Sequence, residues 1–308
     1  MVNTDFYMIP KINQKVQVIA TYSQRMIVRA ANDEYFKARI KGKKLRPVCG
    51  DWVLIESIKN EDEKLITKIS LRNNELSRIN TRGIREVLAA NINLLIIVIA
   101  VHPEPDWYVV DRYISTAENM GIKATIVFNK IDLDKKNNKT ITFIQDYKKI
   151  GYQTIKCSVK KNSNLDKICQ IVKNKTAILV GQSGVGKSSI INKTTNNILK
   201  ISEISAVSGQ GKHTTANSMM FNLPNKGKLI DSPGIRDFIT YAESFSEIIS
   251  GYKEIKLHGV DCKFHNCRHL REPNCAVKHA VLKGKITNHR YNSYKRLINI
   301  LKNLKKIN

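Results

Sequence analysis

The stretch TAILVGQSGVGKSSI, residues 176–190, decides the fold of the chain's central part. An apolar run leads straight into a glycine-rich loop that satisfies the G-x-x-x-x-G-K-S/T pattern through Gly181, Gly186, Lys187 and Ser188. In such a loop, backbone N–H groups surround the phosphates of a nucleotide at the start of a helix, whose dipole favours anions. The stretch therefore predicts a strand, a phosphate-binding loop and a helix.

Side chains in and after this loop carry the phosphate chemistry. We expect Lys187 to reach the β- and γ-phosphates and Ser188 to bind Mg²⁺. Gly184 and Ser189, inside and directly after the motif, are assigned to the same nucleotide site. Downstream, the stretch KLIDSPG places Asp231 at the end of an apolar run, where a carboxylate can hold Mg²⁺ through water.

Two loop segments predict how the γ-phosphate is sensed and cleaved. Gly234, the last residue of D-x-x-G, can offer its N–H to the γ-phosphate. The stretch SGQGKHTTANS, residues 208–218, has the composition of a switch loop, and we favour Thr215 as its Mg²⁺ ligand; an ordinary polar loop is the alternative. The residue after D-x-x-G is Ile235, which cannot orient water, so intrinsic turnover should be slow. His213 is the candidate catalytic side chain, with a merely solvated histidine as the alternative.

A second motif predicts that the base of the nucleotide is guanine. The stretch TIVFNKIDL, residues 125–133, contains Asn129, Lys130 and Asp132 in an N-K-x-D pattern. The Asp132 carboxylate can accept both guanine N1–H and N2–H₂, which adenine does not offer, so the wrong base leaves the carboxylate unpaired. The loop that begins at Ser158, in CSVKK, can contact guanine O6 through its backbone.

The order of these motifs is unusual, because the base motif precedes the phosphate loop. A nucleotide pocket is built in space from loops at one edge of a sheet. If the original termini of the chain lie close together, they can be joined and the chain opened elsewhere without losing the pocket. We therefore predict a circularly permuted GTPase domain. Because D-x-x-G then lies at the domain's C-terminal end, we hypothesise that GTP and GDP place the following C-terminal domain differently.

Three segments differ in their sequence patterns. Residues 1–72 contain five short alternating stretches, which predict an N-terminal β-barrel with an OB-fold that binds RNA; a barrel that is only structural or that grips protein is the alternative. Residues 73–240 alternate strands with helices, which predicts an α/β domain whose parallel sheet is covered on both faces. Residues 241–308 have a helical pattern that ends in an amphipathic helix. The apolar residues of that helix are Tyr294, Leu297, Ile298, Leu301 and Leu304.

A cluster of thiols and imidazoles in this last segment predicts a metal site. Cys262, Cys267, His269 and Cys275 lie within DCKFHNCRHLREPNC, and three thiolates with one imidazole suit a tetrahedral structural Zn²⁺. Such a set leaves no open position for catalysis. His265 is a rival imidazole that the spacing alone does not exclude.

The composition is that of a soluble globular protein with a strongly basic surface. The 308 residues carry a net charge of +26 at pH 7, which favours a polyanionic partner such as RNA; a lysine-rich coding bias is the alternative. No acidic residue follows Glu272. The longest apolar run, residues 94–101, is too short to span a bilayer, and the first residues lack a signal peptide's apolar centre. We expect a cytoplasmic protein without a membrane partner.

Together these motifs resemble the RsgA family of GTPases that depend on the small ribosomal subunit, also called YjeQ/YloQ. The likeness runs over essentially the whole chain, through CGDWVLIE, VVDRYISTAE, FNKIDL, GQSGVGKSSIIN, GKHTT, DSPGI and the C-x4-C-x-H-x5-C set. It implies an OB-fold, a permuted GTPase domain and a zinc domain. It also implies Cys262, Cys267, His269 and Cys275 as zinc ligands and His213 as a catalytic residue.

The resemblance further implies a GTPase that binds the 30S subunit and its 16S rRNA. Such an enzyme would hydrolyse GTP to GDP and phosphate during late subunit assembly, with stimulation by the ribosome. Two alternatives are a translation or signalling GTPase with a protein effector, and an RNA-binding nucleotide switch with little turnover. The expected cofactors are one structural Zn²⁺ and Mg²⁺ with GTP. Nothing in the sequence demands a dimer, so we expect a monomer.

Overall fold

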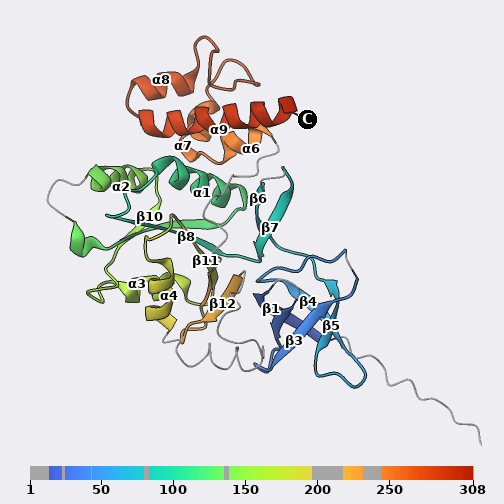
Figure 1. Ribbon diagram of the computed structural model, residues 1–308. Coiled ribbons are helices and arrows are strands. Elements are labelled where there is room, and N and C mark those ends of the chain that lie inside the picture. Colours follow the sequence, from blue (N-terminus) through green and yellow to red (C-terminus); the bar gives the residue numbers. More distant parts are fainter. Residues whose placement is uncertain are drawn as a thin grey trace, which may run out of the picture.

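The structure is a computed structural model, and it consists of a β-barrel, an α/β domain and a helical unit (Figure 1). It describes residues 14–22, 25–42, 44–79, 83–134, 139–195, 218–231 and 244–307. The barrel and the α/β domain share one 11-stranded sheet. The helical unit lies against α1 and α2 of the α/β domain (Figure 1). In these described ranges, no helix is long and apolar enough to cross a membrane.

The N-terminal barrel has the connectivity of the predicted OB-fold. Its strands are β1 (Gln14–Thr21), β2 (Met26–Arg29), β3 (Tyr35–Ile40), β4 (Trp52–Ser57) and β5 (Lys64–Ile69). Neighbouring strands follow the order β1-β2-β3-β5-β4, and β1 also pairs with β4, which closes the barrel. Alternate side chains of β1, Val16 and Val18, point into the core of the barrel, as the period of two along a strand requires.

The α/β domain contains a six-stranded part of the sheet in the order β10-β9-β8-β11-β13-β12. Its strands are β8 (Leu94–Ala100), β9 (Lys123–Asn129), β10 (Gln153–Lys156), β11 (Thr176–Val180), β12 (Ser218–Asn222) and β13 (Lys228–Asp231). Five of them are parallel, as predicted, whereas β12 is antiparallel to β13. The difference arises because a short turn joins β12 to β13, and a short turn connects only antiparallel neighbours.

Helices cover both faces of this sheet (Figure 1). They are α1 (Trp107–Asn119) and α2 (Lys139–Lys149) on one face, and α3 (Leu165–Val172) and α4 (Lys187–Thr195) on the other. Successive residues of β8 point to opposite faces: Leu95 and Ile97 pack in the α1/α2 core, and Ile96 and Val98 in the α3/α4 core. A strand buried on both sides needs a continuous apolar run, which explains the sequence of β8.

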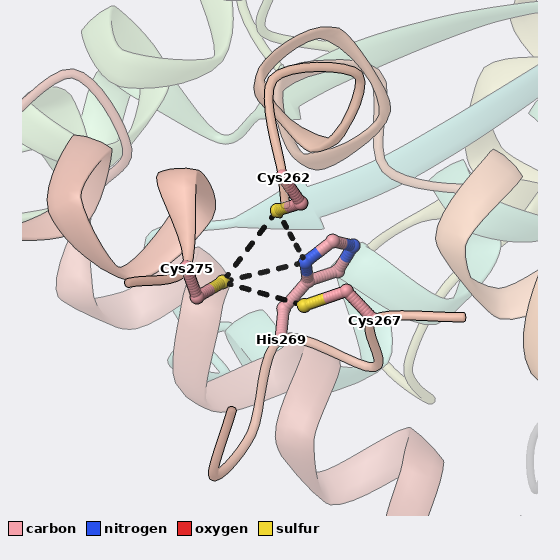
Figure 2. A group of neighbouring side chains, drawn as sticks. All are labelled: Cys262, Cys267, His269 and Cys275. Atoms are coloured by element: carbon pink, nitrogen blue, oxygen red, sulfur yellow. Dashed lines mark hydrogen bonds between the residues drawn. The ribbon is translucent and has the colours of Figure 1, made fainter. Parts of the chain in front are cut away.

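The C-terminal unit is helical, as its sequence predicts. Its helices are α6 (Phe245–Ser250), α7 (Lys253–Gly259), α8 (Ala276–Leu282) and α9 (Asn288–Ile307). The predicted apolar stripe of α9 is buried at Tyr294, Leu297, Ile298 and Leu301, within the core of this unit. The loop between α7 and α8 carries the cysteine and histidine side chains shown in Figure 2.

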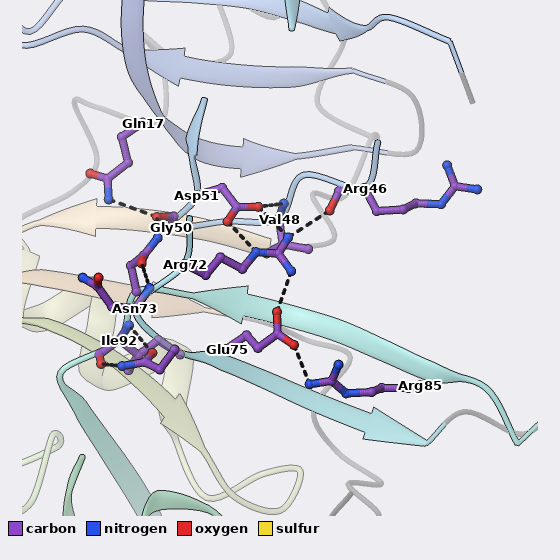
Figure 3. A network of polar contacts seen from close by, with 12 residues as sticks. Gln17, Arg46, Val48, Gly50, Asp51, Arg72, Asn73, Glu75, Arg85 and Ile92 are labelled. Carbon is purple, nitrogen blue, oxygen red and sulfur yellow. Dashed lines mark hydrogen bonds and ion pairs between the residues drawn. The ribbon is translucent and has the colours of Figure 1, made fainter. Parts of the chain in front are cut away.

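A hairpin that the sequence patterns do not predict connects the barrel to the α/β domain. Its strands are β6 (Glu75–Ile79) and β7 (Arg85–Ala90). Arg72 donates from Nε and Nη2 to the two oxygens of the buried Asp51, at 2.8 Å each, and from Nη1 to Glu75 at 2.7 Å (Figure 3). The hydrogen bond to Asp51 raises the pKa of Arg72, so the guanidinium stays charged. This chain of charges fixes the barrel against the hairpin.

A second ion network fixes the helical unit to the α/β domain. Arg290 of α9 is 1 % exposed and donates to Asp111 of α1 at 2.7 Å and to Glu254 of α7 at 2.6 Å. Tyr147 of α2 donates to the same Asp111 oxygen at 2.5 Å. Complete burial opposes ionisation of Asp111, but the Arg290 charge and the interactions with His289 and Ser293 together outweigh it and lower the pKa of this carboxyl. The two units are therefore joined by charges that lack access to water.

Candidate nucleotide site and metal cluster

The predicted nucleotide-binding residues converge at one edge of the sheet, although they come from distant parts of the chain. Asn129 ends β9, Ser158 lies just after β10, Gly181 follows β11 and Asp231 ends β13. These strands are parallel, so the loops at their carboxyl ends meet on the same side. Open α/β sheets bind ligands at this edge. The permuted chain order leaves this convergence intact.

The phosphate loop has a conformation that only glycine allows at its key positions. Gly181 and Gly186 have φ angles of +139° and +96°. A Cβ at Gly181 would collide with the Val98 carbonyl oxygen, and a Cβ at Gly186 would collide with Asn129 Nδ2. Lys187 begins α4 and donates from Nζ to the carbonyls of Gly181 and of Gln182, at 2.8 Å each. The ammonium thus lies over the loop in which a phosphate would be bound.

The two groups predicted to hold Mg²⁺ near the phosphates lie together. Ser188 Oγ donates to Asp231 Oδ2 at 3.2 Å. A hydroxyl and a carboxylate oxygen are ligands that Mg²⁺ accepts, directly or through water, and Mg²⁺ in such sites also binds substrate phosphates. Ser189 and Gly184 are exposed next to them. The predicted residues His213, Thr215 and Gly234 lie outside the described residues.

The base motif is braced against the phosphate loop. Asn129 is buried, and its Nδ2 donates to the Val185 carbonyl at 2.9 Å. Lys130 has a left-handed backbone, with φ of 59°, and donates from Nζ to His102 O at 2.8 Å and to Gly184 O at 2.7 Å. The stem of Lys130 therefore crosses from the base motif to the phosphate loop. A nucleotide would be held by one connected structure rather than by two independent loops.

The carboxylate predicted to recognise guanine is half-buried, and a neighbouring hydroxyl orients it. Asp132 lies in the short 3-10 helix η1 (Ile131–Leu133). Ser158 Oγ donates a short hydrogen bond to Asp132 Oδ1. This bond lowers the pKa of Asp132, so the carboxylate stays ionised and able to accept two hydrogen bonds from a base.

Some supporting contacts carry no signal in the sequence. Ser158 contributes its side chain to Asp132, whereas the sequence suggests only a backbone contact to the base. Val159 N–H donates to Asn129 Oδ1 at 3.3 Å. Gln182 Oε1 accepts from the Asp106 N–H at 3.2 Å, which ties the phosphate loop to the start of α1. Such contacts depend on loop conformation, and only the folded loops reveal them.

The metal cluster has the size of a tetrahedral zinc site (Figure 2). Sγ of Cys275 lies 3.8 Å from Sγ of Cys262 and of Cys267, and 3.5 Å from Nδ1 of His269. A tetrahedron with Zn–S of about 2.3 Å and Zn–N of about 2.0 Å has edges of about 3.8 Å between sulfurs and about 3.5 Å between sulfur and nitrogen. The donor set therefore fits Zn²⁺. His265 is exposed and does not belong to the cluster.

The loop that carries the cluster is held by surrounding hydrogen bonds. The Glu272 carboxylate accepts from the backbone N–H groups of Arg268, Leu270 and Arg271, at 2.8 to 3.0 Å. Partial burial opposes its ionisation, but these donors lower the pKa of Glu272 to about 2. Tyr291 of α9 donates to the His269 carbonyl at 2.6 Å. These bonds fix the backbone on both sides of the histidine ligand, as supporting contacts do in metal sites.

A phosphate loop, an N-K-x-D motif and a D-x-x-G strand, in permuted order and joined to an OB-fold barrel, define the class of circularly permuted GTPases. The sequence pattern of the family described as RsgA GTPase matches residues 69–240. The chain belongs to the RsgA GTPase family, and it is a GTP hydrolase.

Relatives support this assignment over most of the chain. A protein of Mannheimia succiniciproducens is 37 % identical over 290 residues, covering 91 % of this chain and 82 % of its own. A protein of Haemophilus influenzae (strain 86-028NP) is 36 % identical over 299 residues, covering 95 % of this chain and 86 % of its own. Both are named "Small ribosomal subunit biogenesis GTPase RsgA".

Two solved structures share the fold. YjeQ from Thermotoga maritima has a TM-score of 0.73 at 24 % identity and covers 94 % of this chain and 99 % of its own. YloQ, described as a circularly permuted GTPase, has a TM-score of 0.71 at 24 % identity and covers 98 % of each chain. The predicted permutation is confirmed by this likeness.

Proposed function

We propose that this protein binds the small (30S) ribosomal subunit and hydrolyses GTP to GDP and phosphate during late subunit assembly, with stimulation by the ribosome. The observation that carries the proposal is the joining of Asn129, Lys130 and the phosphate loop into one guanine-nucleotide site. The relatives' names supply the small subunit as the setting. The net charge of +26 suits a partner made largely of RNA.

In this proposal each group at the nucleotide site has one role. Lys187 and the glycines of its loop bind the phosphates, while Asp132, placed by Ser158, binds guanine. Ser188 and Thr215 bind Mg²⁺, which would neutralise charge that develops on the phosphates during cleavage. The remaining assignments are His213 as the group that acts on the attacking water, and Asp231, Gly234, Gly184 and Ser189 as further nucleotide contacts.

The other units serve the same activity. Cys262, Cys267, His269 and Cys275 hold one structural Zn²⁺, and its binding would organise a loop that has little core of its own. We assign 16S rRNA contact to the barrel, residues 1–72, and to the zinc unit, residues 241–308, on either side of a GTPase domain at residues 73–240. We further propose a monomer located in the cytoplasm.

Steady-state GTP hydrolysis tests the proposal directly. The purified protein is assayed alone and with 30S subunits, 50S subunits or free 16S rRNA. We expect slow turnover alone and strong, selective stimulation by 30S. His213→Ala should abolish the stimulated rate while GTP still binds. Tight GTP binding without stimulation by any of these additions would contradict the enzyme role and favour the nucleotide-switch alternative.

A further inference from the structure

The first turn of helix α1 is held by two different parts of the molecule. Trp107 and Val109 pack against the α1/α2 core of the α/β domain. Tyr108, between them, is buried instead in the core of the C-terminal unit, together with Ile248 of α6 and Ile298 of α9. The ring of Tyr108 is therefore a side chain of the α/β domain that the C-terminal unit encloses.

A charged side chain of α9 covers this ring. The guanidinium carbon of Arg296 lies 3.9 Å from the centroid of the Tyr108 ring. A guanidinium stacks on an aromatic face, because the plane fits the ring and the charge is attracted by the ring quadrupole. The Tyr108 ring thus has both an apolar core and a flat cation as neighbours, and together they fix the first turn of α1.

The residue that caps this turn is bonded to the phosphate loop. Oδ1 of Asp106 accepts from the N–H groups of Tyr108 and Val109, at 3.0 and 3.3 Å. The N–H of Asp106 donates in turn to Oε1 of Gln182, at 3.2 Å. Because the cap joins the residue before the helix to its first turn, a displacement of Tyr108 would also displace the N–H to which Gln182 is bonded.

Gln182 also contacts the lysine that is expected to reach the phosphates. Its backbone carbonyl accepts from Lys187 Nζ at 2.8 Å, while its side chain makes the bond to Asp106. Further along the loop, the Gly184 carbonyl accepts from Lys130 of the base motif at 2.7 Å. The phosphate loop therefore has two separate supports, one from the base motif and one from the start of α1.

We propose that Gln182 is a positioning residue of the nucleotide site, and that the C-terminal unit supports the phosphate loop through it. The support begins at Arg296 and Tyr108, passes through the cap of α1 and ends at Gln182. Phosphates bind to backbone N–H groups of the loop, and a loop that is already held in its bound conformation binds more tightly. The inference concerns the nucleotide site alone and does not depend on the 30S subunit as the partner.

Nucleotide affinity without any partner tests this support. The full-length, zinc-loaded protein is titrated with fluorescent GDP, and non-hydrolysable analogues of GTP and ATP compete for the site. The variants are Gln182→Met, which keeps the length of the side chain without its amide oxygen, Tyr108→Leu, which removes the ring, and the combination of both. The matched controls are Gln170→Met, on the exposed side of α3, and Tyr294→Leu, another buried tyrosine of the same core that belongs to α9.

We expect Gln182→Met to weaken binding of GDP and of the GTP analogue about three- to tenfold, as the loss of one hydrogen bond does. Tyr108→Leu should weaken both by a similar factor. The combined variant should lose no more than the larger single loss, because both changes break the same support. The preference for the GTP analogue over the ATP analogue should stay unchanged, since Asp132 is not affected. Both controls should bind like the unchanged protein.

The inference is overturned if Gln182→Met binds nucleotide like Gln170→Met, or if the losses of the two single variants add in full. It is also overturned if Tyr294→Leu loses as much affinity as Tyr108→Leu, because general loosening of the C-terminal unit would then be the cause. Should Tyr108→Leu fail to fold, Arg296→Met takes its place, because it removes only the exposed stacked charge; it should weaken binding about twofold or more. No ribosome is present in this assay, so its failure would leave the proposed 30S-stimulated activity untouched.

Discussion

Asn129 couples the base motif to the phosphate loop of the nucleotide site. Its backbone ends β9, and its side-chain amide donates to the Val185 carbonyl of the phosphate loop. Gly186 packs so closely against this amide that a side chain there would displace it. Gly186→Ala should therefore weaken GTP binding through the base motif as well as through the phosphate loop. We expect a loss of about tenfold or more, as for an unsatisfied buried amide.

Gly184→Ala is the matched control for this prediction. Gly184 also has a positive φ, +78°, but a Cβ there would meet only Pro103 Cδ, at 3.7 Å. Both variants carry backbone strain, and only Gly186→Ala disturbs Asn129. Competition binding with a fluorescent guanine nucleotide compares the two, and equal losses would show that strain alone acts.

Asp132 should determine which base is bound. Asp132→Asn replaces an acceptor pair with one acceptor and one donor, which suits xanthine, whose C2 carries an oxygen. We expect GTP affinity to fall by about two powers of ten or more and affinity for xanthosine triphosphate to rise. Isothermal titration calorimetry with both nucleotides measures this change in base preference, and an unchanged preference for GTP would contradict the role of Asp132 in recognising guanine.

The pH dependence of base selectivity follows from the same residue. The Ser158 hydrogen bond lowers the pKa of Asp132 below its ordinary value of about 3.9. The Asp132 carboxylate is therefore fully ionised well above its ordinary pKa. Selectivity for guanine is lost only as the pH falls through the lowered pKa. The ratio of GTP to ATP affinity should therefore be flat between about pH 5 and pH 8.

At the scale of elements, the zinc loop depends on one carboxylate. Glu272 accepts three backbone N–H groups, and a glutamine has a single acceptor oxygen to offer them. Glu272→Gln should loosen the loop and speed zinc release to a chelator about tenfold, as loss of a supporting contact does elsewhere. Asp261→Asn removes an exposed charge next to the same loop and is the control. Equal release rates would leave Glu272 without this role.

Elements with a strong local pattern could be predicted from the sequence. The five barrel strands, β8 and α1 show periodic or continuous apolar runs, and the glycine spacing of the phosphate loop reflects backbone constraints that act locally. The zinc ligands follow from their chemistry, and His269 is distinguished from His265 by burial in the fold. The roles of His213 and Thr215 remain predictions.

Features that depend on distant contacts could not be predicted in this way. The β6–β7 hairpin has little alternation, and its position follows from the Asp51–Arg72–Glu75 charges. The antiparallel β12 gains its place from β13 on one side and from β1 of the barrel on the other. β13 follows β12 after a short turn, but β1 lies far away in the sequence, so its pairing with β12 leaves no local signal.

At the scale of the molecule, Arg290 binds carboxylates on both sides of a domain junction. Arg290→Met would leave the Asp111 and Glu254 carboxylates buried without their partner. We expect a loss of about 3–5 kcal/mol in the free energy of unfolding. Adding Asp111→Asn and Glu254→Gln to the variant should restore part of this loss, because no buried charge then remains.

The sign of the pH effect separates this explanation from lost packing. In the unchanged protein, the pKa of Asp111 is lowered, so its stabilising effect is present above the ordinary pKa of an Asp and is lost as pH falls below it. Without Arg290 the buried carboxylates should prefer the neutral form, so the variant gains stability as pH falls toward 5. Thermal unfolding should show a larger deficit at about pH 8 than at about pH 5.

The same junctions bear on whether nucleotide state moves whole domains. The sequence order suggests that the C-terminal unit moves when the γ-phosphate is lost, yet the Arg290–Asp111 ion pair joins this unit to α1. Gly251, directly after α6, also approaches Ser115 of α1 too closely for any side chain at position 251. On the other side, β1 of the barrel is paired with β12 and Gln17 accepts from Lys228 at 2.8 Å. These contacts favour one body over three independent ones.

Label distances between the units decide between these possibilities. Site-specific labels at the exposed positions Lys68, Lys167 and Leu282 report the barrel, the GTPase domain and the C-terminal unit. We expect equal distances in GDP and in a non-hydrolysable GTP analogue, because movement would separate buried charges from their partners. A shift of about 5 Å, one helical turn, would show that the junctions open and would restore the hypothesis of a displaced C-terminal domain. Equal label distances in the two nucleotide states would instead mean that the domains do not move, so a bound partner must sense the γ-phosphate at the nucleotide site itself.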